Sequence, residues 1–320
     1  MPPPRPRLSR REQTWLLGLV VLLGGWLLLL AALAVRPDGL LHFWALDVGQ
    51  GDALLIQTPG GRDVLVDGGP DPAAVARGLG RHLPFWQRDL ALVVLTHPHE
   101  DHIAGLIDTL DHYHVGSVLQ TPFAAGDAGL EAAWGRVLTA TGVPVQLAVA
   151  GQTFALEPGV VVQVLAPPPA LLHGTHSDIN NSSVVLRLNY GTVGLLLAGD
   201  IETEAGGDLL TRAGGALRSQ VLKVPHHGSA SGLSAALLAA IQPQVAVISV
   251  GAANRYGHPA PATLDLLRAA GVPTYRTDTD GTVEILSDGH QIWVRPAGHE
   301  PRSRSPPGCL AHCPPGGTPD

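Results

Sequence analysis

Lysine and positive charge are scarce in this 320-residue chain. Of its 20 basic residues, Lys223 is the one lysine and the other 19 are arginines. Residues 37–298 contain 13 basic and 24 acidic side chains, a net charge of −11. An acidic domain is not drawn to phosphates over long distances. This excludes a protein that coats DNA non-specifically, and any contact with nucleic acid must be local or assisted by metal ions.

Cysteine is also rare. Cys309 and Cys313 lie in residues 299–320, a stretch rich in proline, glycine, serine and arginine whose composition predicts a disordered tail. Their spacing is compatible with a disulfide bridge outside the cytosol and equally with two free thiols. Since no cysteine lies near the histidine-rich segments, a zinc site with thiolate ligands is excluded there.

One long hydrophobic run is present. Residues 14–35 contain no charged side chain over 22 positions, enough for the about 20 residues that span a bilayer. Residues 1–13 are basic, which predicts a cytoplasmic N-terminus and a domain outside the cytoplasm. A cleaved signal peptide is the alternative, because Ala32-Leu33-Ala34 has the form of a cleavage site. The run is longer than a typical signal peptide core, which favours a single-pass anchor in the cytoplasmic membrane.

Residues 39–298 alternate between short apolar runs and helical patterns. Strands are predicted near 42–48, 53–58, 63–69, 90–96, 159–166, 182–191, 193–200, 219–224, 245–251, 282–289 and 290–296. Helices are predicted near 72–83, 102–113, 201–213, 233–241 and 261–271. Strands and helices that alternate in two similar halves predict one layered α/β domain.

The segment "LTHPHEDHIAG", residues 95–105, gathers three histidines and two acids within six positions after an apolar strand. If the strand ends at Thr96 and a helix begins near Asp101, four side chains emerge around one loop: His97, His99, Asp101 and His102. Imidazole and carboxylate groups suit zinc or another borderline divalent metal. Two histidines alone cannot complete a tetrahedral site, so further ligands must come from distant segments. A hydrated polar loop is the alternative.

Other polar side chains also follow predicted strands. His258 comes after the strand at 245–251 and could be the last metal ligand, or a loop histidine packed beside Pro259. His226 and His227 follow the strand at 219–224. One of them could bind metal while the other contacts a phosphate or protonates a leaving group, and the sequence does not decide which. Lys223 could steady a phosphate.

The pattern His-x-His-x-Asp-His at 97–102 resembles the signature of the metallo-β-lactamase superfamily, and "LVDGG" (65–69) and "LLAGD" (196–200) resemble two further segments of that family. The resemblance implies a four-layer αββα fold over residues 39–298 and two divalent metal ions, Zn²⁺ or Mn²⁺. It implies that His97 and His99 hold one metal, that Asp101 and His102 hold the second, that Asp200 bridges them, and that Asp67 braces the metal loop.

Five segments resemble, more narrowly, the C-terminal domain of ComEC-type DNA-uptake proteins: "LDVGQGDALLI" (46–56), "THPHEDHIAG" (96–105), "LKVPHHGS" (222–229), "NRYGHP" (254–259) and "YRTDTDGTVEI" (275–285). The resemblance implies a metal-dependent nuclease that degrades the DNA strand left outside the cell. Many superfamily members have a histidine ligand where this chain has Asn180 or Asn181, so the first metal is expected to be held weakly, or completed by water. ComEC-type proteins also carry a multi-span channel, so a separate channel protein is expected as a partner.

The leading hypothesis is hydrolysis of a phosphodiester in DNA by a two-metal centre. The metals would supply the positive charge that the acidic domain lacks and would activate a water molecule. Asp101 would take part in catalysis, and His226, His227 or His258 would protonate the leaving oxygen. One alternative keeps the metals but acts on a small ester, lactone or phosphodiester. Another is a non-catalytic domain that docks onto a separate DNA channel.

Overall fold

The computed structural model describes residues 9–34, 37–124, 126 and 129–297, and the side chains within 29–34 lie outside that description. The chain divides into two compact units, Met1–Asp38 and Gly39–Asp320. The predicted tail at 299–320, with both cysteines, falls outside the described residues.

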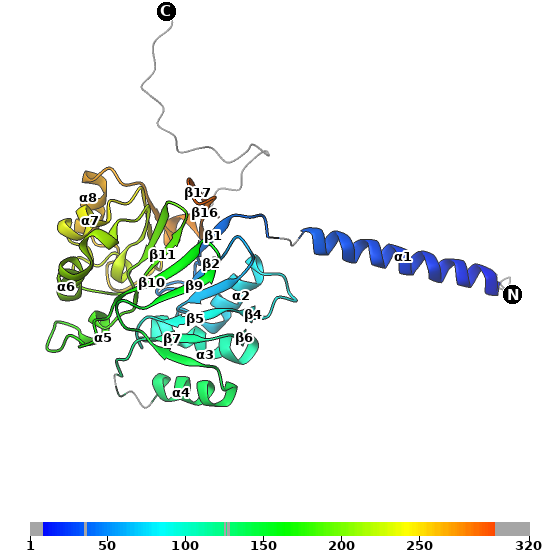
Figure 1. Cartoon of the computed structure of the whole chain (residues 1–320), viewed down its shortest axis with the longest axis horizontal. Coiled ribbons are helices and arrows are strands. Elements are labelled where there is room, and N and C mark those ends of the chain that lie inside the picture. Colours follow the sequence, from blue (N-terminus) through cyan, green and yellow to red (C-terminus); the bar gives the residue numbers. More distant parts are fainter. Residues whose placement is uncertain (1–8, 35–36, 125, 127–128, 298–320) are drawn as a thin grey trace, which may run out of the picture. The chain divides into compact units, whose positions relative to one another are not determined.

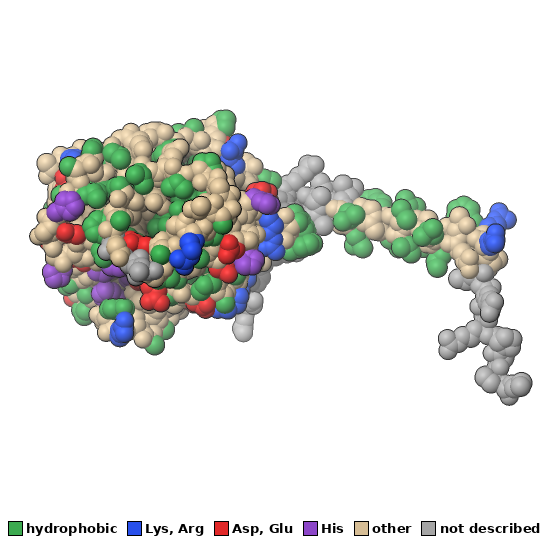
Figure 2. Space-filling view, turned by 90° about the horizontal axis from the view of Figure 1, so that it is seen from below, with side chains coloured by type: hydrophobic (Ala, Val, Ile, Leu, Met, Phe, Trp, Pro, Cys, Tyr) green, Lys and Arg blue, Asp and Glu red, His purple; other side chains and the backbone are tan. Residues whose placement is uncertain are grey.

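The N-terminal unit contains one helix, α1 (Arg10–Ala34). A capping box sets its start, because the Ser9 backbone N–H donates to Glu12 Oε2 at 2.8 Å and the Glu12 N–H donates to Ser9 Oγ at 3.3 Å. Hydrophobic side chains are exposed along this helix from Trp15 to Leu28, and arginines lie near its first turn (Figure 2). Within the described part of the chain, no helix combines the length and the apolarity needed to cross a membrane. The side chains of α1 are described up to residue 28. The predicted anchor at 14–35 extends beyond that residue and stays a prediction.

The second unit is built on two sheets (Figure 1). The first sheet has the order β17 (Ile292–Pro296), β16 (Val283–Ser287), β1 (Leu41–Ala45), β2 (Leu54–Gln57), β3 (Asp63–Val66), β5 (Leu92–Leu95), β7 (Val118–Gln120) and β8 (Val145–Leu147). The second has the order β15 (Thr274–Arg276), β14 (Val245–Ile248), β13 (Val221–Lys223), β12 (Val193–Leu197), β11 (Val185–Tyr190), β10 (Val160–Ala166) and β9 (Thr153–Glu157). A short pair, β4 (Asp89–Leu90) and β6 (His114–Val115), lies apart from both.

Helices cover the outer face of each sheet. Helices α2 (Pro72–His82), α3 (Glu100–His112) and α4 (Leu130–Thr141) share one hydrophobic cluster with the first sheet. Helices α6 (Thr203–Ala213), α7 (Ala235–Ile241) and α8 (Pro261–Ala269) share another with the second sheet. Short helical turns complete the chain at α5 (Asp178–Asn181), η1 (Gly214–Leu217), η2 (Pro225–Gly228) and α9 (Thr277–Asp280).

The central core lies between the two sheets. Strand side chains alternate between faces, so Val64 and Val66 of β3 join the cluster shared with the second sheet, whereas Leu65 joins the cluster under α2 and α3. The layers therefore follow the order helix, sheet, sheet, helix, which confirms the predicted αββα arrangement. Helix α3 begins at Glu100 with His99 as its N-cap, one residue earlier than the expected start near Asp101.

Candidate metal centre

The histidine-rich loop joins the end of β5 to the start of α3. Asp67, directly after β3, fixes this loop: its Oδ1 accepts the Thr96 backbone N–H at 2.8 Å, and its Oδ2 accepts the Thr96 hydroxyl at 2.7 Å. The same Oδ2 lies 2.8 Å from His102 Nδ1. That contact leaves His102 Nε2 free to bind a ligand, so the structure gives Asp67 the bracing position expected of it.

Asp200 lies at the middle of the cluster. It follows β12, and its backbone N–H donates to Ser183 Oγ at 3.1 Å. Its Oδ2 lies 3.4 Å from His102 Nε2 and 3.9 Å from His97 Nε2. His99 joins from the other side, with Nδ1 3.0 Å from His97 Nε2. The loop after β5 and the end of β12 thus meet although about a hundred residues separate them in the sequence.

His227 completes one side of the cluster. Its Nε2 lies 3.2 Å from Asp200 Oδ2 and 3.3 Å from Asp101 Oδ2, while its Nδ1 lies 3.0 Å from the Ser249 carbonyl oxygen. Both His226 and His227 have left-handed backbone conformations, with φ of 50° and 52°. This turn after β13 points His227 inward and leaves it buried, while His226 is partly exposed.

The donor set fits divalent metal ions. Among the described residues, His97, His102 and Asp200 form one group whose ligand atoms all lie within 4.8 Å of one another, and Asp101, His102 and His227 form a second. Ten buried side-chain atoms of the described residues have no hydrogen-bond partner, and His102 Nε2, His227 Nε2 and Asp200 Oδ1 are among them. Buried polar atoms are normally satisfied, and cations in both groups would satisfy the two imidazole nitrogens.

Opposite charges inside the cluster shift its pKa values strongly. Burial opposes ionisation of Asp200, but His227 and His102 outweigh it and lower the pKa of Asp200 well below its ordinary value. Burial likewise opposes protonation of His102 and His227, but the surrounding carboxylates raise the pKa of both well above the usual range. Burial, with the charge of His102, lowers the pKa of His97 and keeps its ring neutral, as a metal ligand requires.

His258 lies outside this inner cluster and belongs to none of the candidate ligand groups that the described residues form. Its ring is 5.5 Å from that of His226, centroid to centroid. His226 Nε2 is 3.9 Å from Asp200 Oδ2, and its Nδ1 is 3.2 Å from Glu202 Oε1. Of the three histidines that could be the last ligand, His227 lies in the inner cluster and His258 lies outside it, next to His226.

The two asparagines support the turn after Asp200. Asn181 Oδ1 accepts the Glu202 backbone N–H at 3.0 Å, and its Nδ2 donates to Glu204 Oε2 at 3.2 Å. Asn180 Nδ2 donates to Glu202 Oε1 at 2.9 Å. Asn181 therefore braces the segment that carries Asp200.

Lys223 requires a correction to the sequence-based expectation. Its side chain is 0% exposed, and Nζ lies 2.7 Å from Asp52 Oδ2. A lysine enclosed in this way does not reach a substrate phosphate. Burial opposes ionisation of Asp52, but Lys223, His227 and His102 together outweigh it and lower the pKa of Asp52 to about 2. Sequence reasoning missed Asp52, whose only trace is its position in the "GQGD" turn.

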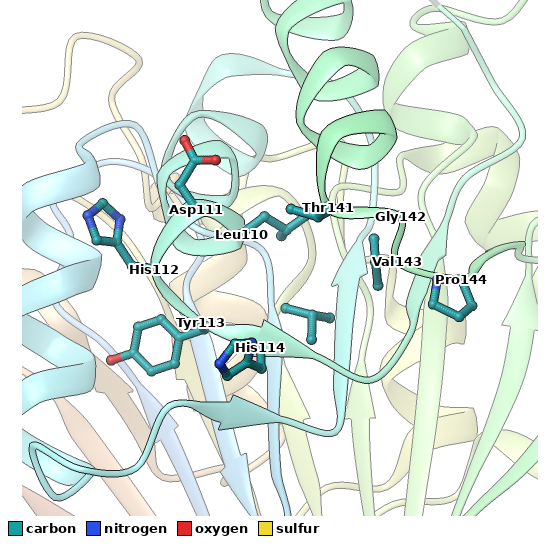
Figure 3. Close-up of a pocket in the computed structure, with 10 residues that line it drawn as sticks. Leu110, Asp111, His112, Tyr113, His114, Thr141, Gly142, Val143 and Pro144 are labelled. Carbon is teal, nitrogen blue, oxygen red and sulfur yellow. The ribbon is translucent and has the colours of Figure 1, made fainter.

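A separate surface cavity of about 440 Å³ lies between the C-terminal end of α3 and the connection from α4 to β8 (Figure 3). Its lining runs over residues 110–115 and 141–144 and includes none of the clustered metal ligands. The candidate metal ligands lie instead at the N-terminal end of α3, away from this cavity.

Comparison with known proteins places the site in a family. Residues 46–252 match the family model described as "Metallo-beta-lactamase superfamily". The chain is 30% identical over 261 residues to ComE operon protein 3 of Bacillus subtilis (strain 168), a match that covers 75% of this chain and 32% of that protein. It is 39% identical over 108 residues to competence protein ComA of Neisseria gonorrhoeae, covering 34% of this chain and 16% of that protein. The chain thus spans a third or less of the length of these relatives.

Among solved structures, CmlA, a diiron β-hydroxylase from Streptomyces venezuelae, is similar with a TM-score of 0.50 and 16% identity, covering 78% of this chain and 53% of that chain. This likeness concerns the fold alone.

Proposed function

The chain belongs to the metallo-β-lactamase superfamily, and from this premise we propose that it is a metal-dependent phosphodiesterase that cuts DNA outside the cytoplasmic membrane. The observation that carries the proposal is that two buried nitrogens without a hydrogen-bond partner, His102 Nε2 and His227 Nε2, lie 3.4 Å and 3.2 Å from the same oxygen, Asp200 Oδ2. Carboxylates and imidazoles that remain unpaired after folding are costly unless a cation joins them.

The residues divide into two ligand groups around Asp200. His97 and His99 would hold one cation on one side, and Asp101, His102 and His227 would hold the other, with Asp200 shared. When bound, two divalent cations would neutralise the substrate phosphate and lower the pKa of a water molecule from roughly 15.7 towards about 7. Asp67 keeps the loop in place for this arrangement through its contacts with Thr96.

Of the three histidines considered for this role, His226 would deliver a proton to the leaving oxygen. Glu202 Oε1 lies beside its Nδ1 at 3.2 Å, while its Nε2 faces the shared carboxylate of Asp200 at 3.9 Å. Its side chain is partly exposed, so it can touch a substrate that enters from solvent. A histidine with a carboxylate beside one nitrogen and its other nitrogen towards the centre suits general acid catalysis.

A DNA substrate is supported by a row of rings that leads outward from the centre. His226 contacts His258, and His258 stacks with Tyr256 at 5.8 Å between ring centroids. Tyr256 is 55% exposed, and the guanidinium of Arg255 lies 5.3 Å from its ring centroid. An exposed aromatic ring beside a cation is the type of surface on which bases of single-stranded DNA stack. The name of one relative, competence protein ComA, refers to competence and agrees with this substrate.

The proposal includes the location of the domain. The arginines before residue 14 and the uncharged run at 14–35 support an anchor with its N-terminus in the cytoplasm and the metal centre outside. A separate channel protein would then take up the DNA strand that is not cut. Protease added to intact spheroplasts should digest the second unit. Protection of that unit until the membrane is lysed would contradict this placement.

The decisive experiment measures DNA cleavage by the purified chain with Mn²⁺ or Zn²⁺. The double variant His99→Ala, Asp101→Ala should lose more than about 100-fold in rate, because it removes one ligand from each group. His112→Ala, at the exposed far end of the same helix, is the matched control and should cut at the wild-type rate. Equal cutting by the double variant would mean a contaminating nuclease or another site.

Two other results would redirect the proposal. Turnover of a nitrophenyl ester or of nitrocefin, without cleavage of DNA, would favour a small-molecule hydrolase. A purified chain that holds no stoichiometric metal would favour a docking domain.

A further inference from the structure

We propose that Asp52 and Lys223 form a permanent charge pair beneath the metal centre, and that Asp52 is the positioning residue that fixes His227 as a metal ligand. This inference rests on the proposed metal centre, but it does not depend on the identity of the substrate. It concerns a carboxylate and an ammonium that the mechanism above does not use.

The pair is unusual because the chain's one lysine is completely enclosed. Lys223 Nζ contacts Asp52 Oδ2 at 2.7 Å and donates a hydrogen bond to the Val224 carbonyl oxygen at 3.0 Å. Both side chains are almost fully buried. Moving two charges out of water costs more than their attraction usually returns, and apolar side chains of similar size generally stabilise a fold better. Stability of the fold is therefore a weak explanation for the pair.

The second oxygen of Asp52 faces the metal centre. Its Oδ1 lies 3.4 Å from His227 Nδ1, which is an ion-pair distance without hydrogen-bond geometry, and the Ser249 carbonyl oxygen is hydrogen-bonded to the same nitrogen at 3.0 Å. When the ring is neutral, as a metal ligand must be, the Ser249 carbonyl oxygen keeps the hydrogen on Nδ1. The lone pair of Nε2 is then left on the side of Asp101 and Asp200. A carboxylate that orients a histidine from behind is a common support for metal ligands.

The same arrangement occurs at the neighbouring histidine. Asp67 Oδ2 lies 2.8 Å from His102 Nδ1, so His102 and His227 each have a carboxylate behind the ring and Nε2 towards Asp200. Asp67 is held in place by Thr96, whereas Asp52 is held by Lys223. Lys223 thus supplies the fixed partner that Asp52 requires.

The backbone ties Asp52 to the opposite ligand as well. Its N–H donates to the Asp101 carbonyl oxygen at 3.2 Å, and its own carbonyl oxygen accepts the Gly69 N–H at 2.7 Å. Gly51, just before it, has φ of 131°, and a Cβ there would collide with the Asp101 carbonyl oxygen. Asp52 is therefore fixed between Asp101 and His227, two ligands of the same proposed metal.

The test replaces the charge pair by a neutral one, Asp52→Asn with Lys223→Met, in the full chain. We expect the double variant to fold and to unfold at a temperature equal to or above that of the wild type. Its affinity for Zn²⁺, measured by competition with a chelator, should fall by about 10- to 100-fold. The visible absorption spectrum of the Co²⁺-loaded protein should change, because one histidine ligand is no longer held. The matched control is Asp63→Asn. Asp63 is a buried carboxylate at the start of β3 whose partners are glutamines, so this variant should keep the wild-type affinity for Zn²⁺.

A folded double variant with wild-type Zn²⁺ affinity and an unchanged Co²⁺ spectrum would overturn the inference. Should it fail to fold, Asp52→Asn alone decides, because its amide N–H₂ can meet the Nδ1–H of His227 and turn the ring. Failure of both variants to fold would also overturn the inference, since it would assign the pair to the stability of the fold. A wild-type chain that binds metal as expected but cuts no DNA would overturn the proposed function and leave this inference standing.

Discussion

At the scale of single residues, the centre depends on which ring nitrogen each histidine turns towards Asp200. His102 and His227 both present Nε2, because acceptors behind their rings occupy Nδ1. His97 is held differently, with Nδ1 3.1 Å from the Thr96 hydroxyl and Nε2 on the side of Asp200. Each ligand is thus oriented before a metal arrives, which reduces the cost of ordering the site on binding.

His227 and His258 should respond differently to removal. His227→Ala deletes a side chain whose Nε2 lies within 3.3 Å of two carboxylates, so we expect it to lose about one metal ion per chain. His258→Ala should retain the wild-type metal content and reduce turnover of DNA, because its ring lies beyond His226. Elemental analysis of both purified variants measures this. Loss of metal from His258→Ala with full occupancy in His227→Ala would reverse the two assignments.

The contiguous ligands were predictable at this scale, and the distant ones only in part. His97, His99, Asp101 and His102 lie within one loop, so chain spacing alone brings them together. Spacing does not show which of two adjacent histidines turns inward. The left-handed backbone conformation at His226 and His227 decides which ring turns inward. This conformation is uncommon in residues other than glycine, and no sequence pattern predicts it here. Asp52 was missed because its partners, Lys223 and His227, are distant in sequence.

At the scale of secondary structure, the candidate ligands lie just after the ends of strands. β3 and β5 are parallel neighbours that end at Asp67 and the histidine loop, and β12 and β13 are parallel neighbours that end at Asp200 and His227. The carboxyl ends of parallel strands meet at one edge of a sheet. Strong apolar runs made these strands predictable. Helix α4 and the strands β6, β7, β8, β9 and β15 were not predicted. Strand β8 shows one reason, since its three side chains are all exposed.

The packing of α3 against the turn after β3 should be sensitive to one methyl group. A Cβ at Gly105 would collide with the Gly68 carbonyl oxygen, so Gly105→Ala must push α3 and the metal loop away. We expect a loss of about 1–3 kcal/mol of stability, or roughly 2–12 °C in Tm, together with weaker metal binding. Gly80→Ala, in the exposed part of α2 with open space around it, is the control and should gain up to about 1 kcal/mol. Equal Tm values for both variants would contradict the proposed contact.

The loop that carries Tyr256 should contribute to binding of single-stranded DNA. Stacking of one base on an aromatic side chain contributes about 1–3 kcal/mol, so Tyr256→Ala should weaken binding of an oligonucleotide by about 5- to 150-fold. Tyr256→Phe should retain most of the affinity, because the ring remains. Phe85→Ala removes an 80% exposed aromatic side chain that precedes β5, at the edge of the sheet opposite the metal loop, and serves as the control. Fluorescence anisotropy measures all three, and equal losses for Tyr256→Ala and Phe85→Ala would show a non-specific effect.

At the scale of the whole molecule, a negatively charged domain can bind a negatively charged DNA substrate only if metal ions are bound at the centre. Residues 37–298 carry a net charge of −11, and several of those acids converge on the centre itself, including Asp52, Asp67, Asp101 and Asp200. Buried carboxylates that repel one another oppose folding unless cations compensate them. The same cations supply local attraction for a phosphate that the surface as a whole repels.

Removal of the metals should therefore destabilise the entire second unit. Ligands that bind only the folded state contribute about 4 kcal/mol when present at a thousand times their dissociation constant. For a domain of this size that corresponds to roughly 8–16 °C in Tm, so addition of EDTA should lower the thermal midpoint by about that amount and added Zn²⁺ or Mn²⁺ should restore it. The variant His99→Ala, Asp101→Ala should show a much smaller shift, because it has lost a ligand from each group. If the wild-type midpoint is the same with and without EDTA, no cation is bound at this cluster, and the charges must be balanced by the protons that His102 and His227 hold in the folded state.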